Sequence, residues 1–244
     1  MKLGGWIGAA AVVLTCWTGD ALARVQENLS VLKPGMVILM QGDSITEGGR
    51  WPGDDFNHIM GQDYAYMLAG EIGLTYPERN LTFLNRAVSG NTVLDLDKRW
   101  QTDTLDLHPD VLSILVGAND SLFHEEDESI DVYEQTYDRL IAEALAQNPD
   151  IKIVLGEPFV LPVGHMELNY DLRLATVKQH QAVVYRLAEK YHLPVVPYQK
   201  AFDEACRRAP ADHWSWDGVH PTYAGHALME EAWLKTVDQF WPAG

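Results

Sequence analysis

The stretch that decides the fold reads MVILMQGDSITEGG and spans residues 36–49. Its first five residues form an apolar run, as expected of a strand buried inside a parallel sheet. The run stops at Gln41 and Gly42, where glycine permits a tight turn, and Ser44 follows just past the carboxyl end of the strand. Because ligands of open α/β sheets bind at the carboxyl ends of the strands, we expect Ser44 to lie in a functional site.

The rest of the chain alternates between strand-like and helix-like patterns. The expected strands are 36–40, 81–84, 111–116, 151–155 and 194–196, and the expected helices are 64–72, 93–100, 130–147, 172–191 and 223–240. This alternation predicts an α/β fold with a central five-stranded parallel sheet, helices on both faces and right-handed crossovers. No internal repeat or linker interrupts the pattern, so we expect residues 24–244 to form a single domain.

A second chemically informative stretch, Asp217-Gly218-Val219-His220-Pro221, lies near the C-terminus. A serine hydroxyl is a poor nucleophile until a base takes its proton, and the base needs a group that orients it. We therefore predict Ser44 as nucleophile, His220 as base and Asp217 as the orienting acid. The alternatives are structural, since serine also caps helices and aspartate also closes turns. His213 and His226 are the competing histidines.

These residues resemble the motifs of the SGNH hydrolases, also called GDSL-type esterases. Four blocks occur in the order of that family: 42–46 (GDSIT), 85–92 (NRAVSGNT), 117–120 (GAND) and 217–220 (DGVH). The resemblance covers about residues 36–233. It implies a three-layer, flavodoxin-like sandwich with strand order 2-1-3-4-5, and a serine esterase that works through an acyl-enzyme.

Attack of a serine on an ester creates an oxyanion, which needs hydrogen-bond donors that are fixed in advance. Three donors are expected here: the backbone N–H of Ser44, the backbone N–H of Gly90 and the side-chain amide of Asn119. Gly90 would leave room for a ligand in the turn after the second strand, and Asn119 follows the third strand. The alternative for Asn119 is turn chemistry.

The sequence says less about the substrate than about the catalytic residues. The blocks around Ser44 and His220 look like those of the carbohydrate acetylesterases, which implies a small-molecule or polysaccharide substrate that carries acetyl esters. Arg50, Trp51, Trp214 and Trp216 are candidate substrate contacts, with packing as the alternative, and residues 157–159 could add another wall. A lysophospholipase or thioesterase for longer acyl chains is the second enzymatic reading. A non-catalytic glycan-binding module would require a lost catalytic residue, and none is missing.

The N-terminus has the pattern of a secretory signal, with Lys2, an apolar segment and a small-x-small site at 21–23. We expect residues 1–23 to be removed and the protein to be secreted or periplasmic, without stable membrane insertion; a lipoprotein anchored at Cys16 is the alternative. Cys206 would then be the single cysteine, which excludes an internal disulfide. It would pack as a small apolar residue.

The composition bears on ligands and partners. The pattern of cysteines and histidines predicts neither a metal site nor another cofactor. The 244 residues carry a formal net charge of −17, which disfavours nucleic acid and anionic membrane surfaces as partners. Neutral substrates such as esterified sugars are not penalised by this charge. The oligomeric state is left open by the sequence.

Overall fold

The computed structural model describes residues 29–53, 55–123 and 129–242, and the predicted signal peptide lies outside them. The strands are β1 (Val37–Gly42), β2 (Thr82–Asn85), β3 (Val111–Leu115), β4 (Lys152–Gly156) and β5 (Val195–Val196). The helices are α1 (Ser44–Glu47), α2 (Tyr64–Thr75), α3 (Val93–Asp103), α4 (Ala118–Leu122), α5 (Ile130–Gln147), α6 (Tyr170–Tyr191), α7 (Tyr198–Ala205) and α8 (Tyr223–Phe240). Short 3₁₀ turns occupy η2 (Pro77–Arg79), η3 (Leu105–Leu107), η4 (Gly164–Met166) and η5 (Ala211–His213).

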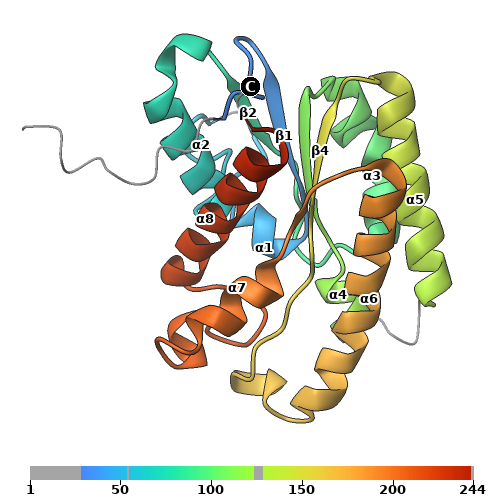
Figure 1. Ribbon diagram of the computed structural model, residues 1–244, viewed down its shortest axis with the longest axis vertical. Coiled ribbons are helices and arrows are strands. Elements are labelled where there is room, and N and C mark those ends of the chain that lie inside the picture. The colour runs from blue at the N-terminus through green and yellow to red at the C-terminus, as the bar shows by residue number, and fades with distance from the viewer. Residues whose placement is uncertain (1–28, 54, 124–128, 243–244) are drawn as a thin grey trace, which may run out of the picture.

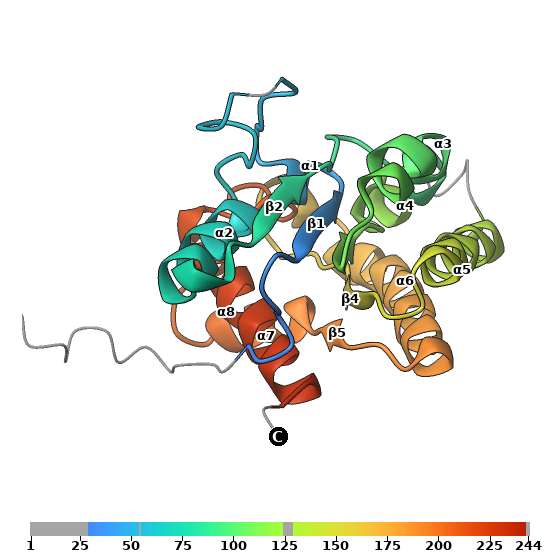
Figure 2. The same ribbon diagram turned by 90° about the horizontal axis from the view of Figure 1, so that it is seen from above.

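The five strands form one parallel sheet in the order β2-β1-β3-β4-β5, which confirms the predicted topology (Figures 1 and 2). β1 lies between β2 and β3, and its residue Met40 is in register with Asn85 and Ser113. The loops that follow these three neighbouring strands carry the first three sequence blocks. Parallel pairing therefore gathers blocks that are far apart in the chain at one edge of the sheet.

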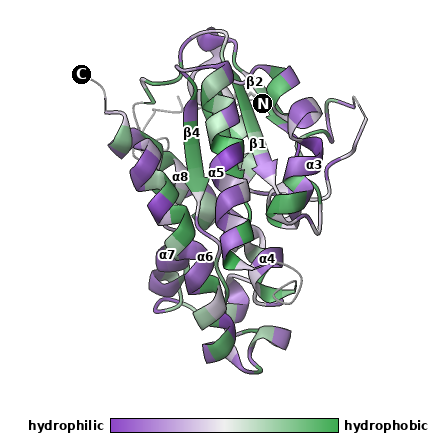
Figure 3. Ribbon diagram, turned by 90° about the vertical axis from the view of Figure 1, so that its right-hand side faces the viewer, coloured by the Kyte–Doolittle hydropathy of each residue, from purple (hydrophilic) through white to green (hydrophobic). Residues whose placement is uncertain are grey.

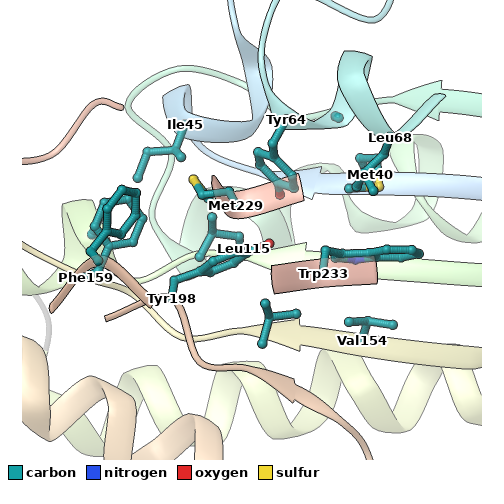
Figure 4. Close-up of a cluster of buried hydrophobic side chains, with 14 of the residues drawn as sticks. Met40, Ile45, Tyr64, Leu68, Leu115, Val154, Phe159, Tyr198, Met229 and Trp233 are labelled. Atoms are coloured by element: carbon teal, nitrogen blue, oxygen red, sulfur yellow. The ribbon is translucent and has the colours of Figure 1, made fainter. Parts of the chain in front are cut away.

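Helices cover both faces of the sheet, also as predicted. The hydrophobic core on one face includes residues of α2, α7 and α8, and the core on the other face includes residues of α3, α5 and α6. Figure 4 shows the first of these cores, where Tyr64, Tyr198, Met229 and Trp233 lie among side chains of the strands. The indole N–H of Trp233 donates to the hydroxyl of Ser113 at 3.0 Å, which fixes α8 against β3.

Local sequence signals explain where several helices begin. The carboxylate of Asp63 accepts the backbone N–H groups of Ala65 and Tyr66 and caps α2, while the hydroxyl of Thr222 accepts from Gly225 and caps α8. The strands are coloured mostly hydrophobic in Figure 3, whereas the helices show a mixed pattern of polar and apolar residues. Among the described residues, no helix has the length and apolar character needed to cross a membrane.

Candidate active site

Ser44 is the first residue of α1 and lies two residues after the end of β1, at the carboxyl edge of the sheet. The helix cap is Asp43, not Ser44: its carboxylate accepts the backbone N–H of Ile45 at 3.0 Å. The capping alternative for Ser44 therefore does not apply, and the serine hydroxyl is free for another partner. The left-handed conformation of Gly48 ends the helix after a single turn.

That partner is His220, which lies 176 positions further along the chain. The Oγ of Ser44 is 2.8 Å from Nε2 of His220, and Nδ1 of the same ring is 2.7 Å from Oδ2 of Asp217. The three side chains thus lie in series, with the ring of His220 between the hydroxyl of Ser44 and the carboxylate of Asp217. The side chains of His220 and Asp217 are 34% and 18% exposed, so the site opens to solvent at the histidine.

The loop that carries Asp217 and His220 is held by its own hydrogen bonds. The Oδ1 of Asp217 accepts the backbone N–H groups of Val219 and His220 at 2.9 and 2.7 Å. The buried hydroxyl of Ser215 donates to the carbonyl of His220 at 2.8 Å and accepts the N–H of Gly218 at 2.9 Å. Sequence reasoning missed Ser215, because no pattern reports which turn its hydroxyl would close.

Electrostatics at this loop favour an ion pair between acid and base. The hydrogen bond that the ring donates to the carboxylate of Asp217 raises the pKa of His220 above its usual value, against the opposing effect of burial. Burial works to raise the pKa of Asp217, but its bonds to His220 and Val219 outweigh burial and hold the pKa below the usual value. A carboxylate that stays ionised beside the ring stabilises the imidazolium that forms when the histidine takes a proton.

The competing histidines have other environments. His226 lies in α8, where its Nδ1 accepts the backbone N–H of Tyr64 at 3.3 Å. Burial and the nearby charge of His220 lower the pKa of His226 to about 4, so this ring is neutral at ordinary pH. His213 packs edge-on against Trp214, with ring centroids 4.7 Å apart. The histidine that is hydrogen-bonded to the hydroxyl of Ser44 is His220.

The predicted oxyanion donors come from the ends of three neighbouring strands. Ser44 follows β1, Gly90 has a φ of +80° in the turn after β2, and Asn119 lies in α4 after β3. The side-chain nitrogen of Asn119 donates to the carbonyl of Asn91, next to Gly90, at 3.0 Å. This bond uses one of the two amide hydrogens of Asn119 and leaves the second for another acceptor. The oxyanion role of these groups remains a prediction.

The candidate substrate contacts differ in accessibility. Trp216 is 66% exposed and stacks on the ring of His220, with centroids 5.7 Å apart and an interplanar angle of 20°. Trp51 is 59% exposed, and the neighbouring Arg50 donates from Nε to the carbonyl of Ala87 at 2.9 Å. Trp214 is buried in the core, and its indole donates to a backbone carbonyl. Of the two tryptophans before Asp217, Trp216 therefore keeps an open face.

The segment after β4 does not form the wall that sequence reasoning allowed for it. Phe159 is fully buried and packs against Phe202, with ring centroids 4.5 Å apart. Glu157 is also buried, and its carboxylate accepts the backbone N–H of Gln199 at 2.9 Å. Both side chains point into the protein, where their contacts with Phe202 and Gln199 hold α7 against the segment that follows β4. Residues that follow a parallel strand can either bind a ligand or pack in the core, and their place in the sequence does not separate the two roles.

A parallel α/β sheet that carries a hydrogen-bonded Ser–His–Asp series at the carboxyl ends of its strands is typical of a class of hydrolases. A sequence model of the GDSL-like Lipase/Acylhydrolase family matches residues 41–228, so this chain belongs to that family. The matched span contains all the site residues described above, from the nucleophile loop to the beginning of α8.

Similar proteins have been characterised and solved. An acetylxylan esterase from Geobacillus stearothermophilus is 32% identical over 217 residues, which is 85% of this chain and 96% of the relative. A crystal structure of that organism's acetylxylan esterase Axe2 superposes with a TM-score of 0.75 at 31% identity and covers 84% of this chain and 95% of Axe2. A Parabacteroides merdae protein named for its likeness to GDSL lipases gives a TM-score of 0.80 at 34% identity, with 84% and 97% coverage.

Proposed function

We propose that this protein is a serine esterase whose nucleophile is Ser44. The observation that carries the proposal is the hydrogen-bonded series from the Ser44 hydroxyl through the two nitrogens of His220 to Asp217, with distances of 2.8 and 2.7 Å. A serine hydroxyl, an imidazole and a carboxylate in this order match the requirements of nucleophilic acyl transfer. Axe2 variants with a serine or an aspartate replaced by alanine are named catalytic mutants of that enzyme.

In the proposed reaction, Nε2 of His220 takes the proton of Ser44 as Oγ bonds to the acyl carbon of the ester. His220 then gives this proton to the departing alcohol oxygen as its bond to the acyl carbon breaks, which leaves an acyl-enzyme. Water attacks the acyl group next and passes a proton to His220. When the bond to Oγ breaks, that proton returns to Ser44, and the free acid leaves.

The tetrahedral intermediates carry negative charge on the former carbonyl oxygen. We assign its stabilisation to the backbone N–H groups of Ser44 and Gly90 and to the side-chain amide of Asn119. The close approach of the ends of β1, β2 and β3 supports this assignment, since it collects these groups at one edge of the sheet. Donors that are held by the fold need no reorganisation when the charge develops.

We infer that the substrate is a short-chain, acetyl-type ester on a carbohydrate. The similarity to an acetylxylan esterase along most of both chains supports this inference. The exposed face of Trp216, stacked beside the base, supports it as well. A flat indole offers a sugar ring a large apolar contact at low cost in conformational entropy.

The test is release of acetate from a panel of acetylated polysaccharides and oligosaccharides, acetylated xylan included. Ser44→Ala is expected to lower turnover by about four orders of magnitude with an intact fold. Ser129→Ala, which removes a cap of α5 instead, is the matched control and is expected to keep turnover. Within an acyl series, the rate should fall steeply beyond two to about four carbons, because a pocket that fits an acetyl group would exclude a longer acyl chain. A rate that rises toward long chains would favour a lysophospholipase or thioesterase.

A further inference from the structure

We propose that Arg99 is a positioning residue that holds the oxyanion donors in place, acting through Asn91. The proposal rests on the esterase function proposed above and adds two residues that lie outside the triad and the three predicted donors. Arg99 lies in α3, the helix that follows the turn with Gly90, and its side chain is 16% exposed. The inference follows from what its guanidinium group binds.

The guanidinium bonds to the ends of two strands. Its Nη1 donates to the carbonyl of Arg86, directly after β2, at 2.6 Å, and its Nη2 donates to the carbonyl of Gly42, the last residue of β1, at 3.3 Å. Nη1 also donates to the side chain of Gln41 at 2.9 Å. One side chain thereby ties the strand that delivers Ser44 to the strand that delivers Gly90.

The third nitrogen of the guanidinium group, Nε, reaches the turn that contains Gly90. Nε of Arg99 donates to the side-chain oxygen of Asn91 at 2.7 Å, and the backbone carbonyl of Asn91 accepts the amide of Asn119 at 3.0 Å. Asn91 directly follows Gly90. The chain of bonds therefore runs from Arg99 through Asn91 to two of the three predicted donors, and Gly42 lies two residues before the third.

The chemistry of arginine suits this task. Its five N–H groups form a rigid planar fork that can bind several acceptors at fixed angles, whereas a lysine ammonium acts as a single point charge. Among the described residues, the acidic hydrogen-bond partner of Arg99 is Asp103, which lies 3.3 Å from Nη1, and the other acceptors are neutral carbonyl oxygens and amides. A group that served mainly as a salt bridge would not need so many neutral partners around the site.

The experiment compares three variants in steady-state ester hydrolysis with a chromogenic acetate ester. Arg99→Met is expected to lower kcat by about 10- to 100-fold while KM stays within about threefold, because misplaced donors affect the transition state more than the ground state. Arg99→Lys should stay close to Arg99→Met, since charge without the fork cannot hold the turn. Asn91→Ala leaves the arginine in place and should lower kcat in the same direction. The control is Arg139→Met on α5, whose side chain bonds Asp97 of α3 away from the site.

A double-mutant comparison with Asn119 shows whether Arg99 positions the oxyanion donors or only stabilises the fold. In an Asn119→Ala background, Arg99→Met should lower kcat by less than about threefold, because part of what it positions is already gone. An equal loss in both backgrounds, full activity of Arg99→Met or full rescue by Arg99→Lys would overturn the proposal. If neither Arg99 variant folds, Asn91→Ala decides the question, and an unchanged kcat in that variant would also overturn the proposal. Undiminished activity of Ser44→Ala would instead refute the esterase proposal.

Discussion

Asp217 uses its two carboxylate oxygens for different purposes. Oδ1 accepts two backbone N–H groups and closes the turn toward His220, and Oδ2 binds the imidazole. An asparagine could keep the first set of bonds through its own oxygen, but it would present N–H₂ to Nδ1 of the ring. The residue therefore shapes the loop and selects the tautomer that leaves Nε2 ready to accept a proton from Ser44.

The pH profile of the reaction tests this arrangement. The base must be neutral to accept a proton, and Asp217 raises the pKa of His220, with Asp43 adding to the effect. Activity should therefore be lost as pH falls through a value at or above ~6.5, the ordinary value for histidine, and should be best in neutral to mildly alkaline solution. A log kcat/KM profile that is flat from about pH 5 to 8 would contradict a histidine base.

Asp217→Asn gives a sharper version of the same test. The substitution should lower kcat by several orders of magnitude even at pH 8, because the imidazole is then held in the wrong tautomer and the imidazolium loses its counter-charge. Circular dichroism would check that the variant still folds, as expected if the side-chain oxygen of asparagine keeps the Oδ1 bonds. If the variant turned over normally at pH 8, His220 would need a different orienting group.

Asn119 should act on the transition state. Asn119→Ala is expected to lower kcat by about 10²–10³-fold, about 3–4 kcal/mol, with little change in KM, because its amide would bind mainly the developing charge. Steady-state kinetics of the two variants Asn119→Ala and Asn119→Asp would measure the effect. An increase in KM at constant kcat would make Asn119 a residue that binds the substrate in its ground state.

Single residues differ in how far the sequence reveals them. Ser44, Asp217 and His220 could be placed together because the chemistry of acyl transfer constrains their types and the fold constrains their positions. Ser215 could not be found, since its role depends on the two hydrogen bonds that its hydroxyl makes within one turn. Trp214 and Trp216 are two positions apart and have opposite environments, which depend on side-chain direction and not on residue type.

At the scale of elements, the junction of β1 with α1 is tightly packed. A methyl group added at Gly42 would lie 2.2 Å from the backbone oxygen of Leu115 on β3, a contact that only movement of a strand could relieve. Gly42→Ala should therefore destabilise the fold by about 2–3 kcal/mol and lower activity as Ser44 shifts.

The control for this prediction is a glycine with free space around it. Gly70 lies exposed in α2, and an added methyl group there would meet nothing within 4 Å. Gly70→Ala should stabilise the protein by about 0.5–1 kcal/mol, because alanine loses less conformational entropy in a helix. Urea denaturation of both variants would measure the difference. Equal stability of Gly42→Ala and the natural protein would show that the junction can relax.

The larger elements were predictable and the small ones were not. Helices α5 and α8 have the bounds expected from their apolar periodicity, and the other expected strands and helices differ by a few residues at their ends. The short helices α1 and α4 and the helix α7 were not expected. α7 spans only 8 residues and begins directly after β5, so its pattern is too short to separate from the strand before it.

For the whole molecule, the net charge of −17 should shape the choice of substrate. Acetylated oligosaccharides that carry uronic acids are repelled by this field, and neutral ones are not. We expect kcat/KM for the acidic oligosaccharides to rise by several-fold as salt increases from about 10 to 200 mM, while the value for neutral ones stays level, because salt screens charge repulsion. A neutral substrate with the same salt dependence would assign the effect to something other than charge.

The central claim is that Ser44 is the nucleophile, and covalent labelling tests it most directly. A fluorophosphonate reacts with an activated serine and leaves a stable phosphonyl group on its oxygen, so peptide mass spectrometry can identify the labelled residue. The account predicts one label per chain, on Ser44, with loss of ester hydrolysis in proportion to labelling and no label on His220→Ala. Labelling of another residue in step with the loss of activity, or full activity after complete labelling of Ser44, would contradict it.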